Sequence, residues 1–301
     1  MSAVDENDAI ESSLVQRLIS IYSNALRKAI KQHASFLRKI RDIDEGRIKP
    51  PQYYVLTDTV ERWRQGFVRE LIRQEGVIDG IVDELDKAGV QAADVIHATM
   101  PEYYSNSRAE AIGQLIAGAS GAAWGAFSGR FTQHTRRQLE IILTDSEPPF
   151  SKMAYQKMGR NPAIRKRLQD EMAKATILGE GQEDIIRRIQ AVTNQATWQA
   201  RRVAQTERTR IQSQAHMDAN AEAVAMGLPV YSTWHTRMVN SRDTHIALNG
   251  KVALHGEYFP GSPLRYPGDP TAPAREVINC HCVMSSDVLM PGQVVVNGEV
   301  V

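Results

Sequence analysis

The segment from Trp234 to Cys282 constrains the fold more than any other part of the chain. It is rich in Gly, Pro, Asn and Asp, and each of its five prolines removes a backbone donor and fixes φ. These are Pro260, Pro263, Pro267, Pro270 and Pro273. The segment also holds both cysteines of the protein and four of its eight histidines. A long helix is excluded here, so the sequence predicts a loop-rich region with a specific chemistry of its own.

The composition indicates a soluble globular protein without a general affinity for nucleic acid. Of the 301 residues, 42% are hydrophobic and 24% are charged, and this length allows one large domain or two ordinary ones. The formal net charge of +1 provides no global basic field that would attract DNA. No apolar run approaches the ~18 residues of a transmembrane helix, and the acidic, polar first residues predict no secretory signal peptide. Cysteines one residue apart rarely reach bridging geometry, which favours a reducing compartment.

The first third of the chain shows helical periodicity. Apolar residues spaced by three and four predict one helix over residues 8–44, a second from about 57 to 87, and a short helix over 92–98 that ends before Pro101. The first helix carries a basic arm without acidic residues, formed by Arg17, Arg27, Lys28, Lys31, Arg38, Lys39 and Arg41. Such an arm either docks on an acidic partner or DNA or, more commonly, is a solvated helix face.

The middle of the chain is expected to remain helical. Small residues dominate 107–129, which favours a close helix–helix contact over the alternative of a membrane-active segment. Further helices are predicted over 132–143, 162–178, 182–192 and 197–226, with a break at 145–150 and Gly227 as the final cap. Strands are predicted over 230–234, 251–254 and 277–278, and the tail from 290 is a terminal strand or a disordered end. The predicted fold class is mainly α: a long helical N-terminal body with a small, loop-rich α+β C-terminal cap.

The cap offers the side chains that zinc prefers. Cys280, Cys282 and His245 supply two thiolates and an imidazole, and a structural zinc site takes four such ligands. We expect His281 as the fourth ligand, with His255 or Asp243 as alternatives. Metal binding would explain how a segment with few apolar residues holds a fixed shape. The alternative is a pair of buried thiols that act as small hydrophobic groups.

The same residues give little support for catalysis. A Cys–His pair can form a nucleophile, and zinc with an open position can activate water. The chain contains no HExxH, no GxSxG, no P-loop and no Gly-rich dinucleotide turn. Glu207 could serve as a base, but a Glu between arginines on a helix is typically an ion-paired surface residue. We therefore expect that the protein is not an enzyme.

Six short motifs follow one another in a fixed order in the C-terminal half of the chain. A helix with T-E-x-x-R is followed by W-x-T, R-x-x-H, L-x-G, P-G-D-P and N-C-x-C. The residues that carry them are Thr206, Glu207, Arg210, Trp234, Arg242, His245, Gly250, Pro267, Gly268, Asp269, Asn279, Cys280 and Cys282. Together, over about residues 175–285, they resemble the phage head-morphogenesis family, the minor head proteins of the Mu F type. Family members often carry an Asp and a second Arg shortly before R-x-x-H, whereas this chain has Val239 and Asn240 there.

The resemblance implies a minor capsid protein of a tailed phage, a prophage or a phage-like particle, without an established catalytic activity. Its implied place is the portal vertex, where it acts in head assembly or DNA delivery. The implied partners are the portal protein and the major capsid protein or other head proteins, in the virion and, during assembly, in the host cytoplasm.

This resemblance also suggests a division of the chain. Residues 1–150 become an α-helical region that binds the portal or capsid, residues 151–290 a head-morphogenesis domain that ends in the cap, and residues 291–301 a terminal tail. The alternative function is an internal head or ejection protein that binds packaged double-stranded DNA. A zinc-dependent enzyme in the cap is a third, weaker hypothesis.

Overall fold

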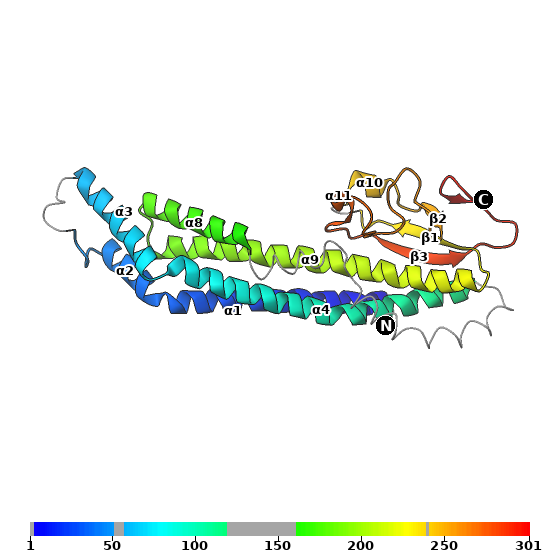
Figure 1. Ribbon diagram of the computed structural model, residues 1–301, viewed down its shortest axis with the longest axis horizontal. Coiled ribbons are helices and arrows are strands. Elements are labelled where there is room, and N and C mark those ends of the chain that lie inside the picture. The colour runs from blue at the N-terminus through cyan, green and yellow to red at the C-terminus, as the bar shows by residue number, and fades with distance from the viewer. Residues whose placement is uncertain (1–2, 51–56, 119–160, 239–240) are drawn as a thin grey trace. The chain divides into compact units, whose positions relative to one another are not determined.

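A computed structural model describes residues 3–50, 57–118, 161–238 and 241–301 of the chain (Figure 1). Long helices dominate, and the strands are short and confined to the C-terminal region. The helices are α1 (Ala3–Gln32), α2 (Ala34–Asp44), α3 (Thr57–Gln74), α4 (Val77–Gly118), α8 (Pro162–Ile177), α9 (Gln182–Ala225), α10 (Asp243–Ile246) and α11 (Ala274–Val277). The strands are β1 (Val230–His235), β2 (Val252–Leu254), β3 (Val283–Val288), β4 (Val295–Val296) and β5 (Glu299–Val300). The predicted fold class, a long helical body with a small α+β cap, is confirmed.

The chain divides into two compact units that are not contiguous in sequence. The first unit comprises residues 1–14, 96–154 and 202–301, and the second comprises residues 15–95 and 155–201. Three long helices, α1, α4 and α9, contribute residues to both units. We name these the cap unit and the bundle unit, and we describe each by itself.

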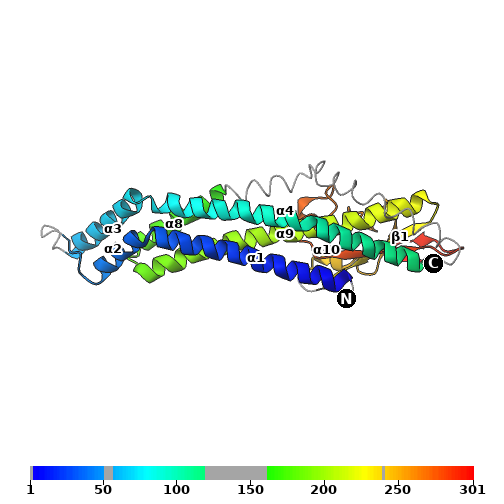
Figure 2. The same ribbon diagram turned by 90° about the horizontal axis from the view of Figure 1, so that it is seen from below.

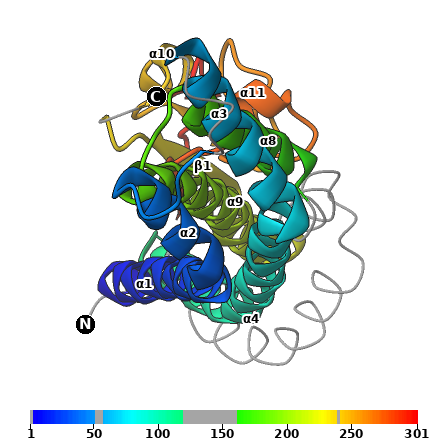
Figure 3. The ribbon, with the colours of Figure 1, turned by 90° about the vertical axis from the view of Figure 1, so that its left-hand side faces the viewer.

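The bundle unit is a set of helices packed around an apolar core. Leu18, Tyr22 and Phe36 are among its buried side chains, because α1 and α2 present an apolar residue every three or four positions. Figure 2 shows α1 and α4 side by side, and Gln32 of α1 donates to Glu84 of α4 at 3.4 Å. The helices α3 and α8 also lie against each other (Figure 3).

The cap unit contains a three-stranded antiparallel sheet in the order β2-β1-β3. The central strand β1 pairs with β3 along its whole length, from Val230 opposite Val288 to His235 opposite Val283. This sheet lies along the C-terminal part of α9 (Figure 1). The Asn220 amide of α9 donates to the Ser232 hydroxyl at 3.0 Å, so a buried hydrogen bond fixes the helix against the sheet.

Two apolar clusters hold the cap unit together. One joins the ends of α4 and α9 to the sheet and contains Ala111, Leu115, Ala219, Ala223, Val230 and Val288. The other lies under the loops and is centred on Trp234, whose ring meets the Phe259 ring edge-on with 5.2 Å between centroids. Both cysteines belong to this second cluster.

Several predicted helix limits are wrong. The helix expected over 8–44 is interrupted at His33, and the one expected over 57–87 is interrupted near Gly76, which has a φ of +56°. Conversely, α4 runs through Pro101 instead of ending there. Met100 and Tyr103, which lie close to Pro101 in sequence, are both buried. The free energy gained by burying their apolar surface offsets the loss of the hydrogen bond that proline removes.

The pair of helices expected over 182–192 and 197–226 is in fact one helix, α9. Thr193 and Ala196 lie in the expected gap and are buried, so the packed face continues across it. The predicted start of α8 is confirmed, because Pro162 follows the Asn161 cap, which accepts from the Ala163 amide at 3.1 Å. Gly227, with a φ of +88°, follows the end of α9 as expected.

The strand predictions were only partly right. The strands at 230–234 and 251–254 are confirmed as β1 and β2, but Val277 belongs to the short helix α11 and not to a strand. The longest partner of β1, β3, was missed because its serines are typical of loops, although its side chains alternate between exposed and buried positions. The tail forms the hairpin of β4 and β5, which confirms the terminal strand.

The glycine-rich segment 107–129 is described only as far as Gly118. That part is the end of α4, and its Ala111 and Leu115 pack against Ala219 and Ala223 of α9, as expected for a close helix–helix contact. The predicted helix over 132–143 and the break at 145–150 lie outside the described residues. Within the described ranges, no helix is long and apolar enough to cross a membrane.

Candidate metal centre

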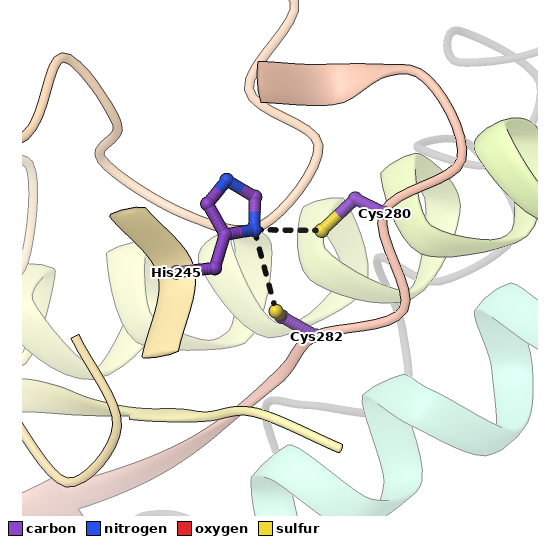
Figure 4. A group of neighbouring side chains, drawn as sticks. All are labelled: His245, Cys280 and Cys282. Carbon is purple, nitrogen blue, oxygen red and sulfur yellow. Dashed lines mark hydrogen bonds between the residues drawn. The ribbon is translucent and has the colours of Figure 1, made fainter. Parts of the chain in front are cut away.

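Three side chains of the cap converge on one point. His245 comes from α10, a single helical turn, and Cys280 and Cys282 come from the knuckle between α11 and β3. The His245 Nδ1 atom lies 3.6 Å from the Cys280 sulfur and 3.5 Å from the Cys282 sulfur (Figure 4). The three ligand atoms all lie within 4.8 Å of one another, and each residue is at most 2% exposed. Two sulfurs and an imidazole in this arrangement can hold a metal ion.

The second ring nitrogen of His245 faces away from the sulfurs (Figure 4). Its Nε2 atom lies 3.2 Å from the Oε2 atom of Glu276, which also accepts from the Thr244 hydroxyl at 3.1 Å. A carboxylate beside the far nitrogen of a histidine favours the tautomer whose near nitrogen is free to bind metal. Sequence reasoning missed Glu276, although it stands only four residues before Cys280.

Hydrogen bonds with α9 fix the position of the knuckle, the segment between α11 and β3 that carries both cysteines. The Gln205 amide and the Thr209 hydroxyl both donate to the Cys280 carbonyl, at 2.9 and 2.6 Å. The Asn279 amide donates to the Thr206 hydroxyl at 2.9 Å. Asn279 has a φ of +58°, and this left-handed turn separates α11 from the two thiols. The T-E-x-x-R helix therefore serves as the support on which the N-C-x-C knuckle lies.

The electrostatics of the two thiols differ. A hydrogen bond from the Cys280 thiol lowers the pKa of Cys282 to about 4; burial opposes this shift, and contacts with His245 and Thr236 reinforce it. The same hydrogen bond, together with burial, raises the pKa of Cys280. The pair thus carries one negative charge readily, and a thiolate is the form that binds metal.

The remaining family-motif residues support the cap instead of forming a second site. Gly268, with a φ of +78°, lies so close to α9 that an added Cβ would be 3.1 Å from the N and Cα atoms of Arg210. The fully buried Asp269 accepts from the Arg265 side chain at 2.9 Å and from the Thr271 amide at 3.0 Å. The P-G-D-P loop is therefore a close contact between the cap and the helix.

Glu207 is ion-paired as expected, with 2.9 Å between its Oε2 and the Arg210 guanidinium. It is not a surface residue, however, because it is only 2% exposed. The packing of the cap on this face of α9 buries it. Arg242 donates to the Ile278 carbonyl and so joins α10 to the knuckle.

His281, His255 and Asp243 do not belong to the group of converging ligand atoms. Burial and the positive charges of Arg208 and Arg237 lower the pKa of His281, which places its side chain near those arginines. The residues of the basic arm belong to the bundle unit. There Lys39 pairs with Glu75 at 2.7 Å and Lys28 approaches Glu84 at 3.8 Å, while the other arm residues are exposed.

The fold and the site together define a mainly helical protein, in which a small cap with a candidate metal centre is fixed on a long helix. Residues 166–285 match the family described as Phage Mu protein F like protein, which supports the resemblance to the phage head-morphogenesis family. The chain is also 25% identical, over 262 residues, to the uncharacterized protein YqbB of Bacillus subtilis (strain 168), with 80% of each chain covered. No solved structure matches the chain. The resemblance drawn from the six motifs is confirmed.

Proposed function

We propose that this chain is a minor capsid protein of a tailed phage or phage-like particle, bound at the portal vertex and acting in head assembly or DNA delivery. The observation that carries the proposal is the family match over residues 166–285. All six ordered motifs lie within that range, and two of them, T-E-x-x-R and N-C-x-C, meet where hydrogen bonds join α9 to the cap. The proposed partners are the portal protein and the major capsid or other head proteins, in the virion and in the host cytoplasm during assembly.

The proposal also assigns a separate role to each part of the chain. Residues 151–290 would be the head-morphogenesis domain, residues 1–150 would bind the portal or capsid, and residues 291–301 would be a tail. The basic arm supports the second assignment, because Arg27, Lys31 and Arg38 are exposed and could meet an acidic portal surface.

Co-expression with the cognate portal protein, followed by sedimentation, tests the proposal. We expect this chain to travel with the portal oligomer at a fixed ratio. A chain that sediments alone would contradict binding at the portal vertex.

Charge reversal tests the role of the basic arm. The triple variant Arg27→Glu, Lys31→Glu, Arg38→Glu should lose co-sedimentation, because it replaces attraction to an acidic surface by repulsion. Lys28 is left unchanged because it lies near Glu84. The matched control reverses Lys166, Arg167 and Arg201, which are equally exposed residues of the same unit, and it should co-sediment normally. Equal behaviour of the two variants would refute the arm as the binding surface.

The alternative function, binding of packaged DNA, is supported by the same exposed basic residues. Phosphate contacts make the affinity for DNA fall steeply with salt concentration. A duplex titration at several salt concentrations decides between the two functions, because a protein held only by the portal should show no such slope.

We further propose that the His245, Cys280 and Cys282 cluster holds zinc with a structural role. Each of these residues is buried, and a buried thiolate and imidazole stabilise the cap best when they share a metal ion. Metal analysis of the purified chain should find about one zinc per molecule, and the His245→Ala variant should lose it.

A further inference from the structure

The candidate metal centre has three protein ligands among the described residues, whereas zinc is almost always four-coordinate. The Thr236 hydroxyl lies 3.7 Å from the Cys282 sulfur. It already donates to the His245 carbonyl at 2.7 Å and accepts from the Trp234 indole at 3.1 Å. The Glu276 carboxylate is at the opposite edge of the imidazole ring and cannot bind the same ion as Nδ1.

A cavity in the cap unit reaches this incomplete site. Its volume is about 170 Å³, and Cys282 lines it while Cys280 and His245 do not. A cavity of this size has room for several water molecules. Cys282 is therefore the one of the three candidate ligands that borders the cavity.

Part of the wall of this cavity is polar, although apolar atoms supply most of its lining. Arg208, Ser213 and His216 of α9 line it together with Arg237. Arg208 is only 3% exposed; it is paired with Glu11, but its Nε atom has no partner. A buried donor without a protein partner is typically satisfied by water, so the polar part of the wall can hold water or a small polar ligand.

We propose that a metal ion bound by His245, Cys280 and Cys282 takes its fourth ligand from this cavity: a water molecule that a small anion such as azide or thiocyanate can replace. The exchange breaks one metal–oxygen bond and forms one bond from the metal to the anion, and the three protein ligands stay in place. This inference rests on the zinc part of the proposed function and adds that the metal centre is open, not closed by a fourth side chain.

Cobalt substitution of the full-length chain tests the inference, because Co²⁺ binds the same kinds of ligand as zinc and is coloured. We expect about one equivalent of cobalt with sulfur-to-metal charge-transfer bands. Azide should then change the visible bands in a saturable titration without releasing the metal. A spectrum that stays unchanged by azide and thiocyanate, with cobalt bound, would overturn the proposal.

A variant that narrows the cavity makes the test specific. Val283 lines the cavity and is 42% exposed, so Val283→Trp can fill the space without disturbing the core. It should weaken azide binding about tenfold or more and leave the cobalt content unchanged. The control is Val294→Trp, at a residue that is 53% exposed and does not line the cavity. If both variants bind azide as the unaltered chain does, the anion does not reach the metal ion through this cavity, and the proposal fails.

Two further outcomes distinguish the proposal of an open coordination position from the proposal that the site binds zinc at all. A bound cobalt ion whose spectrum changes in the His281→Ala variant would show a closed site with His281 as fourth ligand, and it would overturn the open site alone. A chain that binds neither cobalt nor zinc would contradict the zinc proposal, and the open position would fall with it.

Discussion

At the scale of single residues, the Cys280 carbonyl is the point at which the cap is tied to α9. It accepts from both Gln205 and Thr209, and the backbone amide of the preceding residue, Asn279, donates to Thr206. These three helix residues are buried, so each bond replaces contact with water. The position of the two thiols therefore depends on polar side chains that bind no metal themselves.

Removing one of these hydroxyls should destabilise the cap. We expect Thr209→Val to lower the free energy of unfolding by about 1 to 3 kcal/mol, because it weakens the satisfaction of a buried carbonyl. The control is Thr193→Val, on the same helix and equally buried, whose hydroxyl bonds only the Ile189 carbonyl one turn earlier. Denaturant unfolding of both variants measures the difference, and equal losses would contradict a role of Thr209 in tying the cap to α9.

The buried His216 predicts a pH dependence of stability. Its side chain contacts the Ser286 hydroxyl at 3.3 Å, and burial lowers its pKa to about 4 from the usual 6.5. Below about pH 6.5 the unfolded chain takes up a proton that the folded chain does not, so stability falls as the pH drops from about 6.5 to 4. The integrated loss is about 3 kcal/mol for this group.

The His216→Gln variant should show a shallower fall in the free energy of unfolding between pH 6.5 and 4. Urea unfolding at several pH values measures this slope. His235, His255 and His281 also have pKa values lowered by burial, so some slope should persist. An unchanged slope would show that His216 is protonated equally in the folded and unfolded states.

At the scale of elements, the P-G-D-P loop and α9 approach each other as closely as two backbones can. Gly268 has no room for a side chain on the side of Arg210, and its φ is positive. This contact gives a physical reason for a glycine at that place in the motif. It also positions the loop that carries the buried Asp269.

The Gly268→Ala variant should destabilise the cap unit more than Gly261→Ala does. Both glycines have positive φ, at +78° and +67°, so both variants incur about 1 to 2 kcal/mol of backbone strain. An added methyl group at Gly261 meets nothing within 4 Å, whereas at Gly268 it meets helix backbone at 3.1 Å. Thermal unfolding compares the two, and equal melting temperatures would refute the close approach.

The limits of the elements were harder to predict than their existence. Apolar periodicity correctly indicated helices within residues 3–50 and 57–118. The predicted helix ends at Pro101 and before Thr197 were wrong, because the packed face continues across both places in the folded chain. The helix break at His33 has no proline or glycine beside it, so the sequence gives no signal that predicts it. The strand β3 was missed because its serines are typical of loops. Its partner strand, β1, lies about fifty residues earlier in the chain, so no local pattern indicates the pairing.

The residues of the candidate site were easier to predict from the sequence than the limits of the helices and strands. Cysteine and histidine chemistry and the six motifs led to His245, Cys280 and Cys282, which the structure brings together. The neighbours that orient them, such as Glu276 and Thr209, are ordinary residues whose role depends on contacts across more than thirty residues of chain. No local pattern marks residues of that kind.

At the scale of the whole molecule, the three residues of the candidate metal centre all belong to the cap unit. Chelation of zinc should therefore loosen the cap and spare the bundle. At free zinc two to three orders of magnitude above Kd, binding stabilises the folded state by about 3 to 4 kcal/mol, and a chelator removes this stabilisation.

Hydrogen exchange of the zinc-loaded chain with and without chelator measures this effect unit by unit. Amides of β1 and β3 should lose protection, and amides of α8 in the bundle unit should not. Chain-wide loss of protection would contradict the confinement of the effect to the cap unit, and unchanged protection would contradict a structural role for the metal.

The discontinuous make-up of the cap unit has a consequence for the order in which the protein matures. Asn7 donates to Ser107, and Glu11 pairs with Arg208, so these residues find their partners only after about one hundred to two hundred further residues have been translated. Every residue of the bundle unit precedes residue 202, so the whole of that unit is translated before the two thiols. If the cap binds a metal ion as proposed, the ligand set can be complete only after Cys282 has been made.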